Sequence, residues 1–274
     1  MSGLSKSGID WCDAVWNPVT GCTPCSAGCD HCYARTMAET RLRGQAGYPE
    51  DEPFRVTLHP ERLDAPWHAR KPRVIFVNSM GDLFHEDVPE RFIRAVLGII
   101  SSAQDHVFVV LTKRPDRMAR VMRGLREGFL EKMHEALNHE LPRSGHAHLR
   151  VLCDAWPLPN LILGVTAENQ DAAYKRLCLL LDTPAACRVV SVEPMLGEVV
   201  LPRGLDWVIC GGESGPGARP MHPGWVRRLR DQCYDQGVPF FFKQWGKRAA
   251  GHLIDGHALR VYPELIQRMR RENT

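Results

Sequence analysis

The chain has 274 residues, of which 44% are hydrophobic and 24% are charged, and its formal net charge is +3. This composition is that of a globular protein long enough for one large α/β domain, and so mild a charge is no argument by itself for a nucleic-acid partner. No apolar run approaches the ~20 residues that span a bilayer, and the first ten residues lack the apolar core of a signal peptide. We therefore expect no membrane partner and a cytoplasmic location.

The cysteines are concentrated near the start of the chain. Of the ten, five lie between Cys12 and Cys32, and four of these follow one another with the spacing Cys22-x2-Cys25-x3-Cys29-x2-Cys32. In an intracellular chain of this size such a cluster indicates metal or redox chemistry rather than disulfides. The residues that bend most easily around a bound group, Gly21 and Gly28, lie in the same segment.

Three kinds of site compete for these cysteines. A structural zinc site needs two separated pairs that fold back on each other, and the pairs here are only three residues apart. An electron-transfer cluster would use four thiolates. A cluster held by three thiolates alone, from Cys25, Cys29 and Cys32, would leave one iron open to a substrate, as a catalytic zinc keeps an open position. In that last case Cys22 and Cys12 are neighbours and not ligands.

Further along the chain, short apolar runs rich in Val, Ile and Phe each end in polar or glycine-containing sequence. Runs this short and unbroken are typical of strands buried on both faces, as in a parallel sheet. The expected strands cover residues 73–79, 106–112, 161–166, 188–193, 206–210 and 238–242.

Helical patterns alternate with these strands, at residues 89–103, 115–136, 171–182 and 223–236. The alternation predicts βαβ units, whose right-handed crossovers coil the sheet into a partial or full (β/α) barrel. The histidine- and proline-containing residues 137–160 interrupt the pattern and are predicted to be an inserted loop. We thus expect one α/β barrel domain over residues 1–258, followed by a charged, helical tail at 259–274.

The spacing Cys25-x3-Cys29-x2-Cys32, followed by Tyr33, resembles the motif of the radical SAM superfamily. The resemblance implies that the three thiolates hold a 4Fe–4S cluster and that S-adenosylmethionine (SAM) chelates the open iron. It also implies a partial or full barrel of parallel strands, with the first strand near residues 14–18 and the cluster loop after it. In such enzymes an electron from an external one-electron reductant passes through the cluster to SAM, which splits into methionine and a 5′-deoxyadenosyl radical that abstracts hydrogen from a substrate.

More narrowly, the chain is similar to the phage-associated three-Cys-motif family, a likeness that implies no substrate. The similar stretches are WNPVTGC (16–22), CDHCYA (29–34), NSMGDLFHEDVP (78–89), LTKRP (111–115), GVTAENQ (164–170), SVEPMLG (191–197), GGESGPGARPM (211–221) and FFFKQWG (240–246). The short stretch GCDHCYA also resembles spore photoproduct lyase, a radical SAM enzyme that repairs a thymine lesion in DNA.

The resemblance directs attention to polar residues at the ends of the expected strands, where barrel enzymes place their chemistry. Many radical SAM enzymes carry Gly-Gly-Glu after the second strand to bind the amino group of SAM, whereas residues 79–82 of this chain read SMGD. We expect the cofactor to be bound by Ser79, Asp82, Thr166, Glu168, Asn169, Ser191, Glu193 and Glu213. Ser191 and Glu193 should point the same way because strand side chains alternate, and a buried Glu193 would need a partner such as a lysine.

The candidates for substrate binding are basic or aromatic residues at the same barrel mouth, namely Lys113, Arg114, Lys243 and Trp245. Trp245 is equally well explained as a core residue. His31 and His85 fit structural roles better than metal or acid–base roles.

The expected function is therefore that of a radical SAM enzyme acting on a nucleic acid or nucleotide, in modification or repair. The basic barrel mouth, the phage association and the local likeness to a DNA-lesion lyase favour this substrate class. Two alternatives remain: a radical SAM enzyme that acts on a protein or small metabolite, and a non-enzymatic binding module stapled by zinc.

Overall fold

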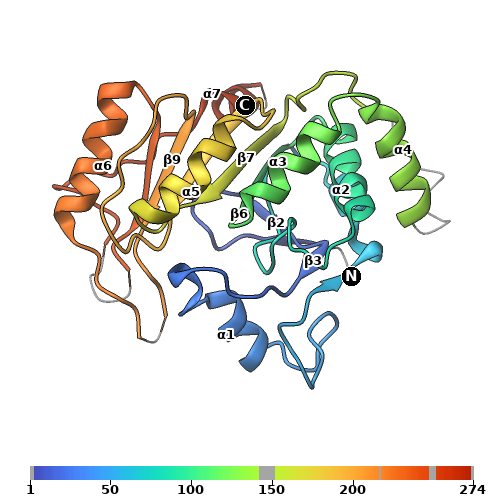
Figure 1. Ribbon diagram of the computed structural model, residues 1–274, viewed down its shortest axis with the longest axis horizontal. Coiled ribbons are helices and arrows are strands. Elements are labelled where there is room, and N and C mark those ends of the chain that lie inside the picture. Colours follow the sequence, from blue (N-terminus) through green and yellow to red (C-terminus); the bar gives the residue numbers. More distant parts are fainter. Residues whose placement is uncertain (1–2, 142–151, 216, 247–250, 273–274) are drawn as a thin grey trace.

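The computed structural model describes residues 3–141, 152–215, 217–246 and 251–272, which form a mixed α/β fold around one large sheet (Figure 1). The sheet has eight strands in the order β1-β2-β5-β6-β7-β8-β9-β10. All neighbouring strands from β2 to β10 run parallel, and β1 pairs antiparallel with β2. The strands are β1 (Leu4–Lys6), β2 (Ala14–Trp16), β5 (Val74–Val77), β6 (Val107–Thr112), β7 (Leu161–Thr166), β8 (Cys187–Val192), β9 (Trp207–Gly211) and β10 (Phe240–Gln244).

Every strand expected from the sequence is present, and the prediction of an α/β fold with a parallel sheet is confirmed. Parallel strands that follow one another in chain order, each joined to the next through a helix or loop, are the arrangement from which (β/α) barrels are built. In the described part of the chain β1 and β10 are the two edges of the sheet and do not pair with each other, so the sheet is open.

The helices are α1 (Tyr33–Thr40), α2 (Glu90–Ser102), α3 (Pro115–Gly124), α4 (Phe129–Glu140), α5 (Gln170–Leu181), α6 (Pro223–Gln236) and α7 (Glu264–Arg271). Gly237 ends α6 in the left-handed conformation that glycine adopts readily. The single helix expected over 115–136 is wrong, because the chain leaves α3 after Gly124 and begins α4 after Gly128, which adopts a positive φ of 65°. The insertion expected over 137–160 begins inside α4, and its residues 142–151 lie outside the described part.

Small elements complete the chain around the cysteines. The two-stranded sheet of β3 (Val19–Thr20) and β4 (Thr57–Leu58) lies beside the main sheet, and a 3-10 turn, η1 (Ala27–Cys29), lies within the cysteine segment. Two more 3-10 turns, η2 (Pro60–Arg62) and η3 (Ala65–His68), lead into β5. No helix in the described ranges has the length and apolar character that crossing a membrane requires.

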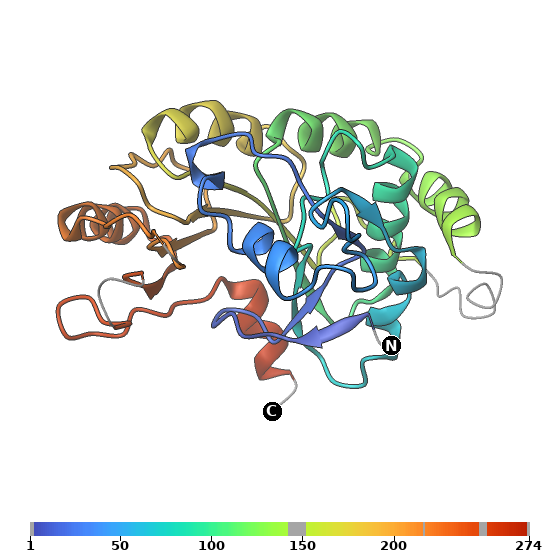
Figure 2. The ribbon, with the colours of Figure 1, turned by 90° about the horizontal axis from the view of Figure 1, so that it is seen from below.

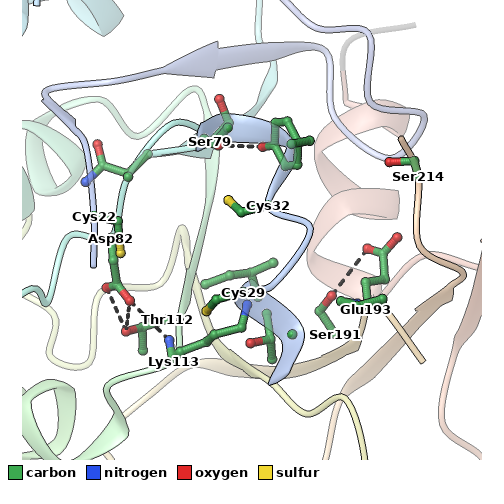
Figure 3. Close-up of a pocket in the computed structure, with 18 of the residues that line it drawn as sticks. Cys22, Cys29, Cys32, Ser79, Asp82, Thr112, Lys113, Ser191, Glu193 and Ser214 are labelled. Carbon is green, nitrogen blue, oxygen red and sulfur yellow. Dashed lines mark hydrogen bonds between the residues drawn. The ribbon is translucent and has the colours of Figure 1, made fainter. Parts of the chain in front are cut away.

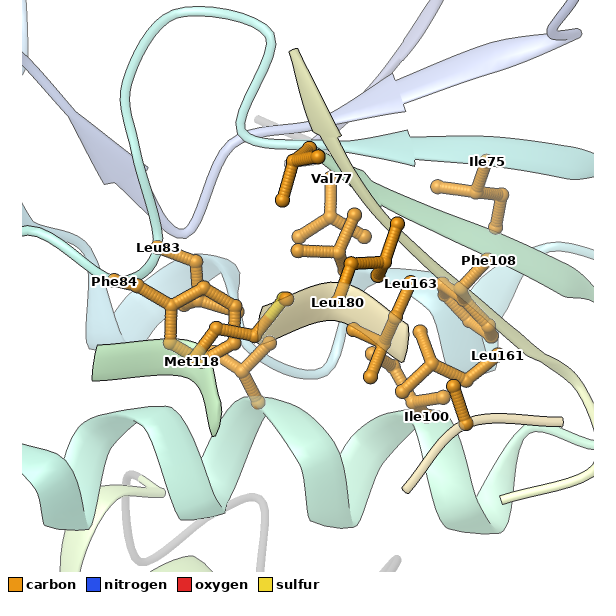
Figure 4. Packing of buried hydrophobic residues seen from close by; sticks show 14 of the residues in the cluster. Ile75, Val77, Leu83, Phe84, Ile100, Phe108, Met118, Leu161, Leu163 and Leu180 are labelled. Carbon is orange, nitrogen blue, oxygen red and sulfur yellow. The ribbon is translucent and has the colours of Figure 1, made fainter. Parts of the chain in front are cut away.

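The two faces of the sheet carry separate hydrophobic clusters, because successive strand side chains point to opposite sides. Helices α2, α3, α5 and α6 are arranged along one face (Figures 1 and 2). Phe108 and Val110 of β6 pack on this side with Ile100 of α2 and Leu180 of α5 (Figure 4). Val107 and Val109 of the same strand belong to the cluster on the opposite face.

That opposite face is covered at one end by segments from both ends of the chain. The cluster there includes Trp11, Trp207 and Ile266 of α7, all of them buried. An ion pair of 2.7 Å between Arg260 Nη2 and Asp10 Oδ2 joins the two segments, and Phe242 of β10 donates a backbone hydrogen bond to Leu259. The rest of this face remains open for a pocket.

Replacing Ile266 with alanine is expected to lower the free energy of unfolding by about 2–5 kcal/mol, because the side chain is fully buried where α7 meets the sheet. Urea unfolding followed by circular dichroism measures the change. Val261→Ala is the matched control: Val261 lies in the same segment with 46% of its surface exposed, so its truncation should cost less than about 0.5 kcal/mol. Equal effects of the two changes would show that α7 does not stabilise the sheet.

Candidate functional site

A pocket of about 460 Å³ opens on the face of the sheet away from helices α2, α3, α5 and α6. All four clustered cysteines line it, together with polar residues that follow the strands. Cys29 and Cys32 lie between the Asp82–Thr112 pair on one side and the Ser191–Glu193 pair on the other (Figure 3). The expected polar residues that line the pocket are Ser79, Asp82, Lys113, Arg114, Thr166, Ser191, Glu193, Glu213 and Lys243.

The cysteine loop, residues 21–32, joins β3 to α1 and has little regular structure of its own. It opens at Gly21, whose φ of +83° suits glycine, and a side chain there would collide with the backbone of Arg55. The loop then makes the short turn η1 and ends at Cys32, directly before α1. All four of its cysteines are free thiols. The loop therefore depends on contacts with the rest of the molecule to hold its shape.

Cys25 and Cys29 interact with each other. A hydrogen bond from Cys25 stabilises the Cys29 thiolate and lowers the pKa of Cys29 to about 5, to which the positive charge of Lys113 also contributes. The same bond, together with burial, raises the pKa of Cys25. Because thiolates are the form that binds metals, the lowered pKa of Cys29 favours the state that a metal ligand requires.

The donor set fits an iron–sulfur cluster. Cys25, Cys29 and Cys32 present three free thiols to one pocket. Among the described residues, no group of three or more His, Cys, Asp or Glu side chains converges as ligands of one metal ion do. Ligands converge in this way around a single ion such as zinc. The thiolates of an iron–sulfur cluster each bind a different iron and need not converge on one point.

Cys22 belongs to a different network. Arg114 Nη1 donates to Cys22 Sγ over 3.4 Å and to Asp82 Oδ2 over 3.2 Å, and its Nη2 donates to Thr23 Oγ1 over 2.9 Å. Burial raises the pKa of the Cys22 thiol to about 11. His85, which is fully buried, lies 2.8 Å from Thr23 Oγ1 through its Nε2 and thereby supports the same network. These contacts agree with the interpretation of Cys22 as a neighbour of the ligands, and with a structural role for His85.

Asp82 lines the pocket, but its carboxylate is already occupied by the protein. Besides Arg114, it accepts hydrogen bonds from the Thr112 hydroxyl, at 2.7 Å and 3.0 Å, and from the backbone amides of Lys113 and Phe84. Asp82 as a whole is only 5% exposed. The environment of Asp82 therefore favours holding the end of β6 in place over binding a cofactor amino group.

Glu168 and Asn169 lie outside the pocket lining, behind the cysteine loop. Glu168 is buried and forms an ion pair of 2.9 Å with Arg176 Nη1 of α5. Although burial opposes ionisation, hydrogen bonding and the Arg176 charge hold the pKa of Glu168 below its ordinary value. A Cβ on Gly28 would lie 3.2 Å from Glu168 Cδ, so a larger residue there would require Glu168 to shift slightly. Asn169 caps α5 by accepting a hydrogen bond from Ala172 N over 3.0 Å.

Ser191 and Glu193 point into the pocket together, as the alternation of strand side chains predicts. Ser191 Oγ donates to Glu193 Oε2 over 3.3 Å, and Lys243 Nζ forms an ion pair of 3.1 Å with Glu193 Oε1. The lysine partner expected for Glu193 is therefore Lys243 of β10, which lies two strands from β8 in the sheet and also lines the pocket. Thr166 also lines the pocket, and its buried Oγ1 makes no hydrogen bond within the described protein.

Glu213 receives hydrogen bonds from two directions. Arg219 donates to its carboxylate through Nε at 3.0 Å and Nη2 at 2.6 Å, and His31 Nδ1 lies 2.9 Å from Oε2. Burial alone would raise the pKa of Glu213, but the bonds from Arg219 and His31 lower it to about 2. The carboxylate is thus a fixed negative charge at the pocket wall.

Replacing Glu213 with glutamine is expected to reduce the acid sensitivity of the fold. Since the pKa falls from 4.5 to about 2 on folding, the carboxylate stabilises the protein above pH 4.5, and this contribution disappears as the pH drops towards 2. Between about pH 6 and about pH 3, the wild type should lose about 2 kcal/mol more unfolding free energy than Glu213→Gln. Urea unfolding at both pH values measures it, and parallel losses in the two proteins would contradict the assignment.

Trp245 does not line the pocket. Its ring packs against Phe242 at a centroid distance of 4.9 Å, and its Nε1 donates to the Leu253 carbonyl over 2.8 Å. Of its two interpretations, the contacts favour the core residue. Lys113, in contrast, reaches the cysteine loop, since its Cε lies 3.4 Å from where a Cβ on Gly28 would be.

Several residues outside the expected cofactor and substrate sets also shape the site. Arg176 and Arg219 fix Glu168 and Glu213, and the Tyr33 hydroxyl donates to the Ser79 carbonyl. Asn78 adopts a positive φ of 57°, lines the pocket, and accepts a hydrogen bond from Val19 N through Oδ1. Tyr33 and Arg219 lie within the stretches that resemble the phage-associated family, and Tyr33 also follows the three-cysteine motif directly.

A comparison with protein families shows where the chain belongs. The profile of the family described as "Protein of unknown function (DUF5131)" matches residues 6–271. The chain is a member of the DUF5131 family. No curated protein and no solved structure matches the chain. The match spans the pocket, the cysteine loop and helix α7 alike, so the function of this DUF5131 chain must be argued from its site.

Proposed function

We propose that this DUF5131 chain is a radical SAM enzyme. The observation that carries the proposal is the convergence of Cys25, Cys29 and Cys32 with the polar strand ends on one pocket of a parallel α/β sheet. Three free thiols in a loop that follows the first parallel strand match the place of the cluster loop in that superfamily, and an open sheet is compatible with a partial barrel.

Cys25, Cys29 and Cys32 would hold a 4Fe–4S cluster, and Cys22 would remain with Arg114. The bound cluster supplies the electron, taken from an external reductant, that splits SAM into methionine and a 5′-deoxyadenosyl radical. Among the residues free to bind SAM, Thr166 offers a hydroxyl that has no hydrogen-bond partner among the described residues. Ser191 offers a hydroxyl that donates to Glu193, and Glu193 offers a carboxylate that is paired with Lys243. Ser79 offers a hydroxyl on the opposite side of the cysteines. Asp82, Glu168 and Asn169 would instead hold the surrounding segments in place.

The experiment that tests the proposal is anaerobic reconstitution with iron and sulfide, followed by reaction with SAM and dithionite. We expect about four iron and four sulfide per chain and the release of 5′-deoxyadenosine. One zinc per chain without iron would favour a stapled binding module. A four-iron cluster that releases no 5′-deoxyadenosine would refute the enzyme and leave an electron-transfer protein.

For the substrate we propose a nucleic acid or nucleotide. Lys113 and Lys243 line the pocket and can contact a phosphate-bearing ligand, although Lys243 is already paired with Glu193. Contacts between lysine and phosphate release counterions, so binding of DNA or RNA should weaken steeply as salt rises. The measurement is fluorescence anisotropy of labelled single-stranded oligonucleotides at about 50 mM and about 200 mM salt. Absence of binding at the lower salt would favour a protein or a small metabolite as substrate.

A further inference from the structure

The side chain of Arg219 links two loops that are far apart in the sequence. On one side it binds Glu213, at the end of β9, through Nε, Nη2 and its own backbone amide, which lies 2.8 Å from Glu213 Oε2. On the other side it reaches the cysteine loop, where Nη1 donates to Asp30 Oδ2 over 3.0 Å and Nη2 donates to the Ala27 carbonyl over 2.8 Å.

The loop-side contacts of this bridge surround Cys29. Ala27 precedes Cys29 by two residues and Asp30 follows it directly. His31, next along the loop, lies 2.9 Å from the same Glu213 carboxylate. The part of the loop between Cys25 and Cys32 is thus attached to the β9 end by one guanidinium and one buried carboxylate, which is only 4% exposed.

We propose that Arg219 is a positioning residue that sets the geometry of the cysteine loop. A planar guanidinium that binds a carboxylate through two parallel bonds fixes direction as well as distance. The loop has only the three-residue turn η1 as regular structure, and segments with so few internal contacts open easily. With Arg219 in place, the backbone on either side of Cys29 is held to the sheet.

The attachment is independent of the Arg114 and Glu168 networks. Arg114 reaches the loop at Cys22 and Thr23, and Glu168 reaches it at Gly28 through a longer contact of 3.4 Å to the amide nitrogen. Arg219 thus bonds to both the backbone and a side chain of the segment from Ala27 to Asp30. Its removal should loosen this segment while Cys22 stays fixed.

Hydrogen exchange on the metal-free protein tests the positioning role directly. In Arg219→Ala, the amides of residues 24–32, other than Pro24, which has no amide hydrogen, should exchange about tenfold faster than in the wild type, because charge-assisted hydrogen bonds contribute at least this factor to an opening equilibrium. Amides of α2, which the bridge does not touch, should keep their rates. Arg219→Lys retains the charge but not the two parallel bonds, so it should give an intermediate rate.

Two further variants separate loss of the loop contact from a general effect on folding. Asp30→Asn weakens only the loop side of the bridge at an exposed residue, so it should fold normally and still accelerate exchange at 24–32. Arg228→Ala is the control, because it removes a comparable ion pair between Arg228 of α6 and Glu198, both about half exposed. It should leave the exchange rates of residues 24–32 unchanged. Wild-type exchange rates at 24–32 in both Arg219→Ala and Asp30→Asn would overturn the proposal.

The consequence for the cluster rests on the proposed function and has its own measurement. After reconstitution and reduction, the electron paramagnetic resonance spectrum of Arg219→Ala should be broadened or shifted relative to the wild type, and that of Arg228→Ala should be unchanged. If the wild type binds no iron but Arg219→Ala still accelerates exchange in the loop, the proposed radical SAM activity is refuted, and the positioning role of Arg219 is not. If the wild type binds iron and cleaves SAM, and Arg219→Ala has the same exchange rates and the same spectrum as the wild type, only the positioning role of Arg219 is refuted.

Discussion

Replacing Cys29 with serine is expected to abolish both iron binding and the cleavage of SAM, whereas replacing Cys22 with serine should preserve both. Cys29 is the thiol whose pKa is lowered to about 5, and it lies at the centre of the cysteine loop. A cluster with three protein ligands cannot lose one of them without losing its main attachment. The release of 5′-deoxyadenosine should fall by more than about 100-fold, which exceeds the usual effect of a residue that only supports a ligand.

Cys22→Ser is the matched control, since the residue lines the same pocket and is bonded to Arg114 instead of to another cysteine. Cys25→Ser and Cys32→Ser should behave like Cys29→Ser, and Cys12→Ser, at a buried thiol hydrogen-bonded to Ser7, like the wild type. Iron content and 5′-deoxyadenosine are measured for each variant. If Cys22→Ser loses iron as completely as Cys29→Ser, four thiolates hold the metal and the open iron required for SAM does not exist.

The strands were predictable because their burial has a simple cause. Runs such as Val107–Thr112 are apolar on both faces, since one face packs under α2 and the other meets Trp207 and α7. The break between α3 and α4 was not predicted, because the pattern of apolar residues continues through it and only the left-handed Gly128 shows where the chain turns. The burial of Ile266 against the sheet was not predicted either, because most residues around it in α7 are charged.

Some of the expected site residues line the pocket and others do not, and the difference has one physical origin. A polar residue next to a strand end is expected at one edge of the sheet, and Thr166, Ser191 and Glu193 do line the pocket there. This position in the sequence does not say whether the side chain faces the pocket or an adjacent loop. Glu168 turns towards Arg176 and Gly28, and Trp245 turns towards Phe242.

The arginines that hold the cysteine loop illustrate what local sequence omits. Arg219 and Asp30 are separated by 189 positions, and Arg114 and Cys22 by 92. Nothing within either neighbourhood indicates the partner, because the contact exists only once the parallel sheet has brought the strand ends together. The same limit applies to Asp82, whose partners Thr112 and Arg114 come from the next strand along the sheet.

Replacing Asp82 with alanine is expected to lower the free energy of unfolding by about 3 kcal/mol, because removing one partner of a buried ion pair leaves the other without compensation. The side chains of Asp82 and Arg114 are 8% and 11% exposed. The change also leaves the Thr112 hydroxyl and the Lys113 amide without their acceptor. We place the effect at the low end of the usual range because Arg114 keeps its bonds to Glu86 and Thr23. Urea unfolding of the metal-free protein measures the loss.

Ser79→Ala provides the comparison, since Ser79 lines the same pocket and its hydroxyl makes one long bond of 3.3 Å to Asn17 Oδ1. That change should cost less than about 1 kcal/mol, because a neutral hydrogen bond of this kind contributes little. If Asp82 served as a ligand for the amino group of SAM and had no structural role, Asp82→Ala would leave the unfolding curve unchanged and raise only the KM for SAM. A large loss of stability in the metal-free protein would instead establish that the position occupied by glutamate in many radical SAM enzymes is used here to hold Arg114, and through Arg114 the first cysteine of the loop.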